Sequence, residues 1–213
     1  MFWLREALES FAEHGLFPLR LLWSRARKRF SKGIVDGDIA RGCLRMQGRM
    51  IRKEVVVRAS VEAVWNAWTT SEGAVTFFAP RANIGLALGG PYELYFDLDA
   101  PEGSRGSEGL KILSFLPMEM LSFEWSAPPQ YPTLRKGQHT WVVLQLYPIG
   151  KNEVRVRLTH LGWREGDEWD KVFRYFKRAW DIVLGRLEYM FSKGPIEWNN
   201  PYRTPQDMSY EIP

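Results

Sequence analysis

The 213 residues are 45% hydrophobic and 14% aromatic, a composition that excludes a largely disordered chain and fits one well-buried domain plus an appendage. The formal net charge of +4 is divided unevenly, since residues 1–49 have ten Lys or Arg against five Asp or Glu, whereas residues 50–213 have nineteen against twenty. The larger part is therefore nearly neutral, which excludes nucleic acid as the expected partner, because nucleic-acid-binding domains present a basic face.

The single cysteine and the polarity of the N-terminus bear on location. Cys43 alone excludes an intramolecular disulfide and a cysteine-rich metal site, and it fits a reducing compartment. No run approaches the roughly 20 apolar residues that cross a bilayer. Acidic Glu6, Glu9 and Glu13 precede most of the basic residues, which is the reverse of a signal peptide. We therefore expect a cytoplasmic protein.

Residues 1–49 are predicted to be a basic N-terminal extension, partly helical or disordered. Apolar side chains between Phe2 and Trp23 are followed by the basic run Arg25–Arg29. A basic amphipathic helix can lie on an anionic membrane surface, so weak membrane-surface contact through residues 1–32 is one interpretation. The other is an extension, or upstream sequence included by a wrongly chosen start codon.

Regular structure is expected from Ile51 onward. Alternating apolar residues predict a strand from Ile51 to Ala59, and Ser60 stands where a helix N-cap belongs. Val61, Val64, Trp65 and Trp68 share one helical face, and a second short helical piece ends near Pro80. The sequence thus predicts one strand followed by two short helices.

The middle of the chain reads as strands joined by turns. Gly89-Gly90-Pro91 predicts a tight turn between strands at about 82–88 and 92–98. A loop covers 99–106, two more strands at 109–116 and 119–126 flank Pro117, and the proline-rich stretch 128–132 is expected to be a loop at the end of the sheet.

Two strands and a long helix follow. Residues 138–147 and 154–160 alternate with period two, so both are predicted strands. After Gly162 the apolar period becomes helical and predicts a helix of roughly 25 residues. Its apolar stripe consists of Trp169, Val172, Phe173, Phe176, Trp180, Val183, Leu184 and Leu187.

This order of elements predicts an α+β fold. We expect a curved antiparallel sheet of six to seven strands wrapped around the long C-terminal helix, with two short helices after the first strand. The domain is predicted to span residues 50–195, and residues 196–213 form an irregular C-terminal tail. A sheet that closes on a helix carrying Trp and Phe can leave an apolar cavity suited to a small molecule.

Several segments in this order resemble one known superfamily. They are the strand-to-helix segment 59–70, the Gly89-Gly90-Pro91-Tyr92 turn, the proline-led strand 117–125 ending in Trp, and 158–163 followed by Glu168, Trp169 and the helical stripe. Together they cover roughly residues 50–195. The chain resembles the SRPBCC (START-like, helix-grip) superfamily, and within it the group of the heat-shock-protein-90 ATPase activator homologue C-terminal domain.

The resemblance implies a deep cavity between sheet and helix that holds lipids, polyketides, hormones or other apolar molecules. It implies no catalytic residue. This chain departs from the group at Phe77-Phe78, where the group commonly has an aromatic pair with Trp, and this difference is expected to change the rim of the cavity.

The predicted ligand-binding residues are the aromatic and apolar side chains on the inward faces of the helices and strands, together with one histidine. They are Trp68, Phe78, Tyr92, Leu94, Phe96, Phe123, Trp125, Val142, Leu144, His160, Trp169, Phe173, Phe176 and Trp180. The alternative for the aromatic residues is that they only fill a core.

His160 is the most informative of the three histidines. Counting by twos from Val154 places it on the inward face of its strand, where it could anchor a ligand or serve as a satisfied structural histidine. His14, His139 and His160 show no zinc-binding spacing, so neither a metal nor another cofactor is expected. The carboxylates at 165–170 are explained by the positive end of the helix dipole.

Three functions remain open. The first is binding of a small apolar or amphipathic molecule, such as a lipid, in the cavity. The second is a cyclase or dehydratase, which requires a general acid or base such as His160 or His139. The third is a chaperone-associated interaction domain, suggested by the name of the group. The sequence does not predict an oligomeric state.

Overall fold

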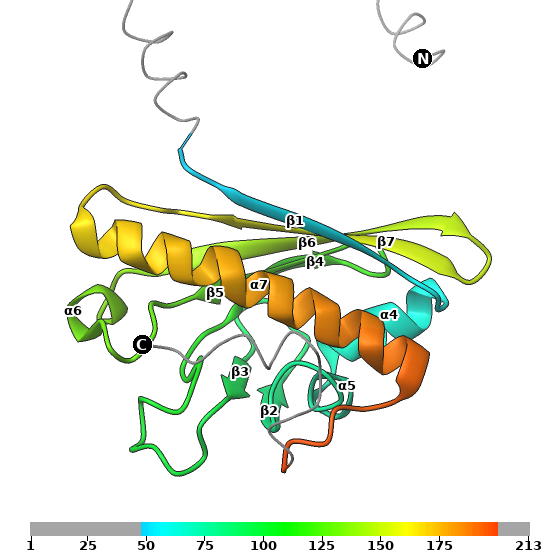
Figure 1. Cartoon of the computed structure of the whole chain (residues 1–213), viewed down its shortest axis with the longest axis horizontal. Helices are drawn as coiled ribbons and strands as arrows, with labels where there is room; N and C mark the ends of the chain where they lie inside the picture. The colour runs from blue at the N-terminus through cyan, green and yellow to red at the C-terminus, as the bar shows by residue number, and fades with distance from the viewer. Residues whose placement is uncertain (1–47, 200–213) are drawn as a thin grey trace, which may run out of the picture. The chain divides into compact units, whose positions relative to one another are not determined.

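A computed structural model of the chain describes residues 48–199. The predicted basic extension, the membrane contact through residues 1–32 and most of the predicted tail lie outside these residues. Residues 48–199 form seven strands and four helices in an α+β arrangement. The long helix α7 runs along one face of a five-stranded sheet, with α6 near its N-terminal end and α4 and α5 near its C-terminal end (Figure 1).

The first strand leads directly into two short helices, as predicted. Strand β1 (Ile51–Val57) is followed by α4 (Val61–Thr69), whose first turn is capped because the hydroxyl of Ser60 accepts a hydrogen bond of 3.2 Å from the amide of Ala63. Thr70 caps α5 (Ser71–Ala74) in the same way, accepting from the amide of Gly73 at 3.0 Å.

A glycine lets these two helices meet. A Cβ on Gly73 would lie 2.2 Å from the backbone oxygen of Asn66 in α4, a separation that no side chain can occupy. The absence of a side chain at Gly73 therefore permits the sharp corner between α4 and α5. The corner brings the following Phe77 and Phe78 into the interior, where both are fully buried.

The predicted strands are divided between two sheets. Five antiparallel strands form the main sheet in the order β1-β7-β6-β5-β4, and two form a separate hairpin of β2 and β3. The bounds are Arg81–Ile84 for β2, Tyr92–Tyr95 for β3, Ile112–Leu116 for β4, Met120–Trp125 for β5, Thr140–Gly150 for β6 and Glu153–Leu161 for β7. The hairpin continues the main sheet through one isolated bridge, between Pro91 and Lys111.

Strands β2 and β3 are shorter than the sequence predicted, because their backbone groups bond within turns. The amides of Phe96 and Asp97 both donate to the oxygen of Arg105, which closes the loop after β3. The amide of Gly85 donates to the oxygen of Pro91, which closes the hairpin turn. The predicted loop at 128–132 runs into the one-turn helix α6 (Pro132–Arg135), which is too short for periodicity to reveal.

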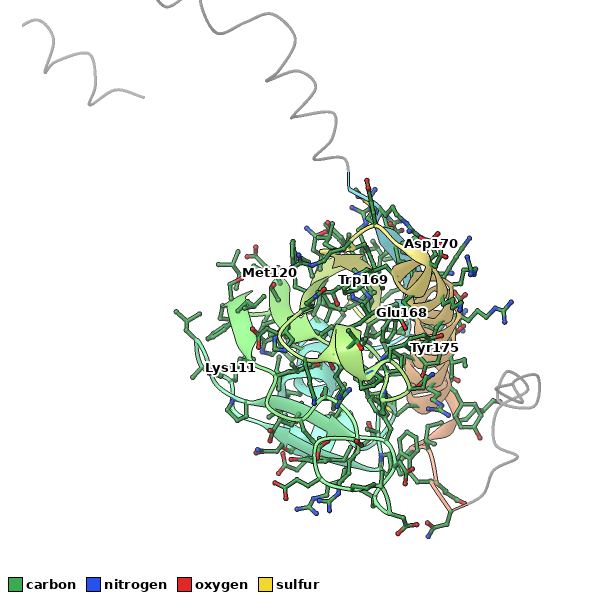
Figure 2. The ribbon with its side chains drawn as sticks, turned by 90° about the vertical axis from the view of Figure 1, so that its left-hand side faces the viewer. Lys111, Met120, Glu168, Trp169, Asp170 and Tyr175 are labelled. Carbon is green, nitrogen blue, oxygen red and sulfur yellow. The ribbon has the colours of Figure 1, made fainter. Side chains whose placement is uncertain are left out.

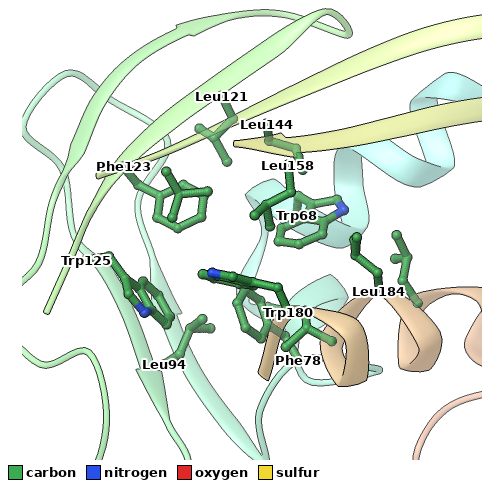
Figure 3. Close-up of a cluster of buried hydrophobic side chains, with 14 of the residues drawn as sticks. Trp68, Phe78, Leu94, Leu121, Phe123, Trp125, Leu144, Leu158, Trp180 and Leu184 are labelled. Atoms are coloured by element: carbon green, nitrogen blue, oxygen red, sulfur yellow. The ribbon is translucent and has the colours of Figure 1, made fainter. Parts of the chain in front are cut away.

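The long helix α7 (Asp167–Lys193) has 27 residues. Its buried residues repeat the predicted stripe, except that Phe173 is only half-buried. The buried set is Trp169, Val172, Phe176, Trp180, Val183, Leu184 and Leu187. This stripe faces the inward side chains of the main sheet, including Phe123, Leu144 and Leu158, and the α4 residue Trp68 (Figure 3).

The residues after α7 pack against the end of α5. The amide of Ile196 donates to the oxygen of Thr76 at 2.8 Å, and the indole of Trp198 donates to the oxygen of Val75 at 2.7 Å. Arg186 of α7 stacks over the ring of Trp198, 5.2 Å from its centroid. Residues 196–199 of the predicted tail are therefore attached to the domain.

Candidate functional site

Two adjoining cavities lie beside α7, where its flank meets β5 and the segment after β3. The large cavity has a volume of about 410 Å³ and the small cavity about 180 Å³. Four aromatic side chains line both: Phe96, Trp125, Tyr175 and Phe176. Because they share these walls, the two cavities form one candidate site with two compartments.

The aromatic walls pack against one another in fixed geometry. The rings of Trp125 and Trp180 lie 5.2 Å apart between centroids, and Phe78 stacks on Trp125 at 5.9 Å. Phe176 stacks on Trp180 at 6.2 Å. Buried aromatic pairs at such distances are held by both area burial and ring electrostatics. The walls shared with the core are therefore rigid.

Helix α7 supplies the other wall of the small cavity through residues beside its buried stripe. Tyr175, Ala179, Ile182 and Arg186 recur at steps of four, three and four, so they form a second line along the helix. The small cavity is bordered mainly by apolar side chains, and Arg186 is the charged residue in its lining. It suits an apolar group.

The large cavity is built by loops that Arg135 of α6 fastens together. Its Nη1 donates to the hydroxyl of Ser126 at 3.2 Å and to the oxygen of Ala127 at 2.9 Å. Its Nε donates to the oxygen of Gly103 at 3.0 Å, and its Nη2 donates to the oxygen of Gly106. One guanidinium thus joins the loop after β3 to the loop after β5, which are two walls of the large cavity.

Arg135 also forms an ion pair, with its Nη2 3.9 Å from Oε2 of Glu108. Burial lowers the pKa of Arg135, and the negative charge of Glu108 acts in the opposite direction. Because Nε, Nη1 and Nη2 of Arg135 all donate to protein acceptors, this side chain holds the walls in place. It has little hydrogen-bonding capacity left for a ligand.

Several other polar groups of the large cavity have open capacity, among them Arg105 and Tyr175. Arg105 lines it and uses its Nε to donate to the oxygen of Ala100 at 3.0 Å, but its two Nη groups make no hydrogen bond or ion pair within residues 48–199. Tyr175 projects from α7 near its N-terminal half (Figure 2). Its hydroxyl likewise makes no hydrogen bond to the part of the chain that the structure describes.

The structure brings only some of the predicted ligand-binding residues to these cavities. The residues that line one or both are Phe78, Phe96, Trp125, Phe176 and Trp180. The others, which line neither cavity, are Trp68, Tyr92, Leu94, Phe123, Val142, Leu144, His160, Trp169 and Phe173. All of these except the half-buried Phe173 are buried. Most of the predicted site is therefore packed core (Figure 3).

Tyr92 illustrates how a predicted site residue becomes structural. Its ring stacks on Phe123 with centroids 4.0 Å apart, and its hydroxyl donates to the oxygen of Trp68 at 3.1 Å. Burial raises the pKa of Tyr92 far above its ordinary value, so the hydroxyl stays protonated. Its hydrogen bond ties β3 to the end of α4.

His160 occupies the inward position that the strand pattern predicted, and the protein satisfies both of its ring nitrogens. Nδ1 accepts a hydrogen bond of 3.0 Å from the indole of Trp180, and Nε2 lies 2.7 Å from the hydroxyl of Thr140. An indole can only donate, so Nε2 carries the proton and donates to Thr140, whose hydroxyl donates to the oxygen of Trp125 at 3.1 Å. This geometry supports the structural alternative for His160.

Burial lowers the pKa of His160 well below its ordinary value. The ring is therefore neutral at neutral pH, and a protonated ring could not accept the hydrogen bond from Trp180. His139 lies elsewhere, with Nδ1 3.4 Å from a carboxylate oxygen of Glu124. Neither histidine lines the large or the small cavity.

Residues 48–199 contain neither a metal-binding cluster nor a membrane-spanning helix. These residues contain no group of three or more His, Cys, Asp or Glu side chains placed to hold a metal ion. No helix among them is both long enough and apolar enough to cross a bilayer.

The sequence patterns missed several residues that border the cavities, chiefly Tyr175, Arg135 and Arg105. Tyr175 directly precedes the stripe residue Phe176, and the helical stripe was predicted from the most apolar residues only. The second line along α7, at steps of four, three and four, is the signal that could have found it. The two arginines stand in loops, where no periodicity predicts the direction of a side chain.

Comparison with known proteins identifies one family and many solved structures of the same fold. The family model described as "Activator of Hsp90 ATPase homolog 1-like protein" matches residues 58–192. A search of curated protein sequences found no match.

Solved structures share the fold at low sequence identity. A protein from Mesorhizobium loti is 18% identical with a TM-score of 0.55, over 70% of this chain and 100% of that one. The Aha1 dimer from Colwellia psychrerythraea is 20% identical with a TM-score of 0.52, over 68% and 98% of the two chains. An HSP90 activator from Plasmodium falciparum is 15% identical with a TM-score of 0.53, over 68% and 97%.

Proposed function

Since the chain belongs to the family described as activator of Hsp90 ATPase homolog 1-like protein, within the SRPBCC helix-grip superfamily, we propose that it binds a small hydrophobic or amphipathic molecule. The binding site would be the large and small cavities beside α7. A concave site with mostly apolar walls and a few polar groups is the usual form of a small-molecule site.

One observation carries this proposal. The two cavities adjoin through four shared aromatic residues, and they lie between α7 and elements of the sheet that are otherwise closely packed. Both cavities open to the surface, since the exposed residue Phe96 lines both of them and the exposed Gln130 lines the large one. Concave, mostly apolar space of about 410 Å³ and 180 Å³ that a ligand can enter from solvent supports binding at this position.

A binding assay with matched variants tests the proposal. Purified protein is titrated with apolar fluorescent dyes and with short and long fatty acids, and its melting temperature is followed. A ligand that binds only the native state should bind with a defined stoichiometry and raise the melting temperature as its concentration rises.

Filling the small cavity should remove this binding. Ala179 is a half-buried lining residue, so Ala179→Phe places a ring in the cavity. Ala87→Phe, at an exposed position of the hairpin turn that lines neither cavity, is the matched control and should bind like the unaltered protein. Absence of saturable binding across the whole panel would overturn the proposal.

The second candidate function is contact with a heat-shock chaperone. The family description and the names of two relatives, the Aha1 dimer and the HSP90 activator, point to it. The turn between β2 and β3 also exposes apolar side chains, with Leu88 73% exposed and Leu86 38% exposed. Stimulation of ATP hydrolysis by the Hsp90 of the same organism, lost in Leu88→Asp and retained in Leu116→Asp, would support this candidate.

A further inference from the structure

The polar groups of the candidate site gather in one of its two compartments. Arg105, Ser104, Gln130 and Asp97 line the large cavity and not the small one, whereas Tyr175 stands at the junction of both. A molecule that filled both compartments would therefore meet different chemistry at its two ends. This asymmetry says more about the ligand than the total volume does.

The small cavity sets the size of the apolar end. An apolar cavity of about 150 Å³ in another protein accommodates benzene. The small cavity, about 180 Å³ and open on one side, therefore has room for one six-membered ring or a short alkyl chain. The small side chain of Ala179 leaves this space open, whereas its lining neighbours on α7 have larger side chains.

The open capacity at the other end includes strong hydrogen-bond donors. The two Nη groups of Arg105 can only donate, and they have no partner within residues 48–199. Glu108 does not neutralise this guanidinium, because its carboxylate accepts from the backbone amides of Gly103 and Arg105 and pairs with Arg135.

The Tyr175 hydroxyl adds a second donor. Burial raises the pKa of Tyr175, so its hydroxyl keeps the proton at neutral pH and can donate to an acceptor. Half-buried polar groups without a partner are costly unless water or a ligand satisfies them. Asp97 is the carboxylate in the lining; its Oδ1 accepts from the amides of Asp99 and Ala100, and the residue is exposed, so water can solvate its other oxygen.

We infer that the ligand is an amphipathic molecule with one ring-sized apolar end, held in the small cavity, and one acceptor oxygen, held in the large cavity by Tyr175 and Arg105. The acceptor is a carboxylate or a carbonyl oxygen. This inference rests on the proposed function and narrows it to a chemical class. Arg135 builds the walls, and Arg105 and Tyr175 recognise the ligand.

Three probes that share one apolar end test the inference. The full chain is titrated calorimetrically with 4-phenylbutyrate, 4-phenylbutyramide and 4-phenylbutylamine, which differ only in the head group. We expect the acid or the amide to bind at least about tenfold more tightly than the amine, which offers a cation and no acceptor oxygen. The order of acid and amide shows whether the acceptor is a carboxylate or a carbonyl.

Matched variants locate the two ends of the ligand. Tyr175→Phe and Arg105→Gln should each weaken binding of the acid or amide by about three- to tenfold, the worth of one hydrogen bond, and should leave the amine unchanged. Tyr189→Phe and Arg178→Gln, on α7 but outside both cavities, should change nothing. Ala179→Phe should abolish binding of all three probes.

These experiments distinguish failure of the acceptor inference from failure of the proposed function. If the amine binds as tightly as the acid and the amide, or if neither Tyr175→Phe nor Arg105→Gln changes their affinity, the acceptor inference is overturned while binding in the cavities stands. If the three probes and the whole hydrophobic panel fail to bind, the proposed function is overturned and the inference with it.

Discussion

The indole nitrogen of Trp180 donates a hydrogen bond of 3.0 Å to Nδ1 of His160. This contact joins the long helix α7 to strand β7 inside the core, since both side chains are almost completely buried. It also fixes the tautomer of His160, because only a ring with an unprotonated Nδ1 can accept from an indole. A polar bond thus sets the position of the helix on the sheet.

The stability of the protein should fall as the pH drops below about 6.5, the ordinary pKa of histidine. His160 has a lowered pKa in the folded protein, so the unfolded chain binds a proton in this range and the folded chain does not. The contribution of His160 to stability is therefore fully present above its pKa in the unfolded chain. It is lost as the pH falls toward its lower pKa in the folded protein. Urea unfolding between pH 8 and pH 5 measures this slope.

Two histidine variants separate this effect from general acid destabilisation. His160→Gln should flatten the slope, whereas His139→Gln should keep it, because His139 lies near the surface with a side chain 38% exposed. An unchanged slope in His160→Gln would show that His160 does not cause the pH dependence.

Trp180→Ala should lower the free energy of unfolding by about 3–5 kcal/mol, as expected for removal of a large packed side chain. Trp180 is 1% exposed and contacts Phe78, Trp125 and Phe176. Trp141→Ala, at a position 41% exposed, is the control and should cost about 1 kcal/mol or less. Chemical denaturation gives both values, and equal losses would contradict this account of the core.

Arg135→Met should destabilise the protein by at least about 2 kcal/mol, because it leaves several backbone oxygens of two loops without their donor. The side chain of Arg135 is only 15% exposed, so water would replace these bonds poorly. Arg178→Met, at an exposed position of α7, should change stability by less than about 0.5 kcal/mol. Hydrogen exchange should show the loss in the loops around residues 103–106 and 126–127.

Gly73→Ala should cost about 1–3 kcal/mol, since overpacking forces the backbone to move. The added Cβ would lie 2.2 Å from the oxygen of Asn66. The control is Gly48→Ala, where the new Cβ meets nothing within 4 Å. Thermal unfolding of the two variants compares them directly, and a neutral Gly73→Ala would mean that the corner between α4 and α5 can open without cost.

A chain that starts at Gly48 should fold and keep its binding properties. The first strand begins at Ile51, and Arg49 already contacts α7 through an ion pair with Asp170 and a position 4.2 Å above the ring of Phe173. Circular dichroism and melting temperature should match those of the full chain. An unfolded shortened chain would show that residues 1–47 are needed by the domain.

The order of elements could be predicted because each carries its own local signal. Strands β6 and β7 alternate with period two, and α7 repeats its apolar side chains with a helical period. Ser60 could be assigned as an N-cap because the chemistry of a cap is local. The division into two sheets could not be predicted, because it depends on which distant backbone groups pair.

The candidate site was predicted less completely, for a reason that Phe123 and Tyr175 illustrate. The inward alternation of β5 and the apolar stripe of α7 mark the residues that face the interior, and Phe123 faces it as expected. Facing the interior does not reveal whether another side chain fills the space opposite. Tyr92 stacks on Phe123 and closes that space, whereas the space beside Tyr175 remains open.

By itself, the sequence determined the α+β class, the long C-terminal helix and the histidine on the inner face of β7, since periodicity and capping act over a few residues. Only the tertiary structure decided where the cavities lie and which polar groups border them. Arg135 donates to four acceptors on two loops that are distant in sequence, whereas the Nη groups of Arg105 bond to no acceptor in residues 48–199. Open volume and free hydrogen-bond capacity are what remains after every long-range contact has formed, so no local pattern can predict them.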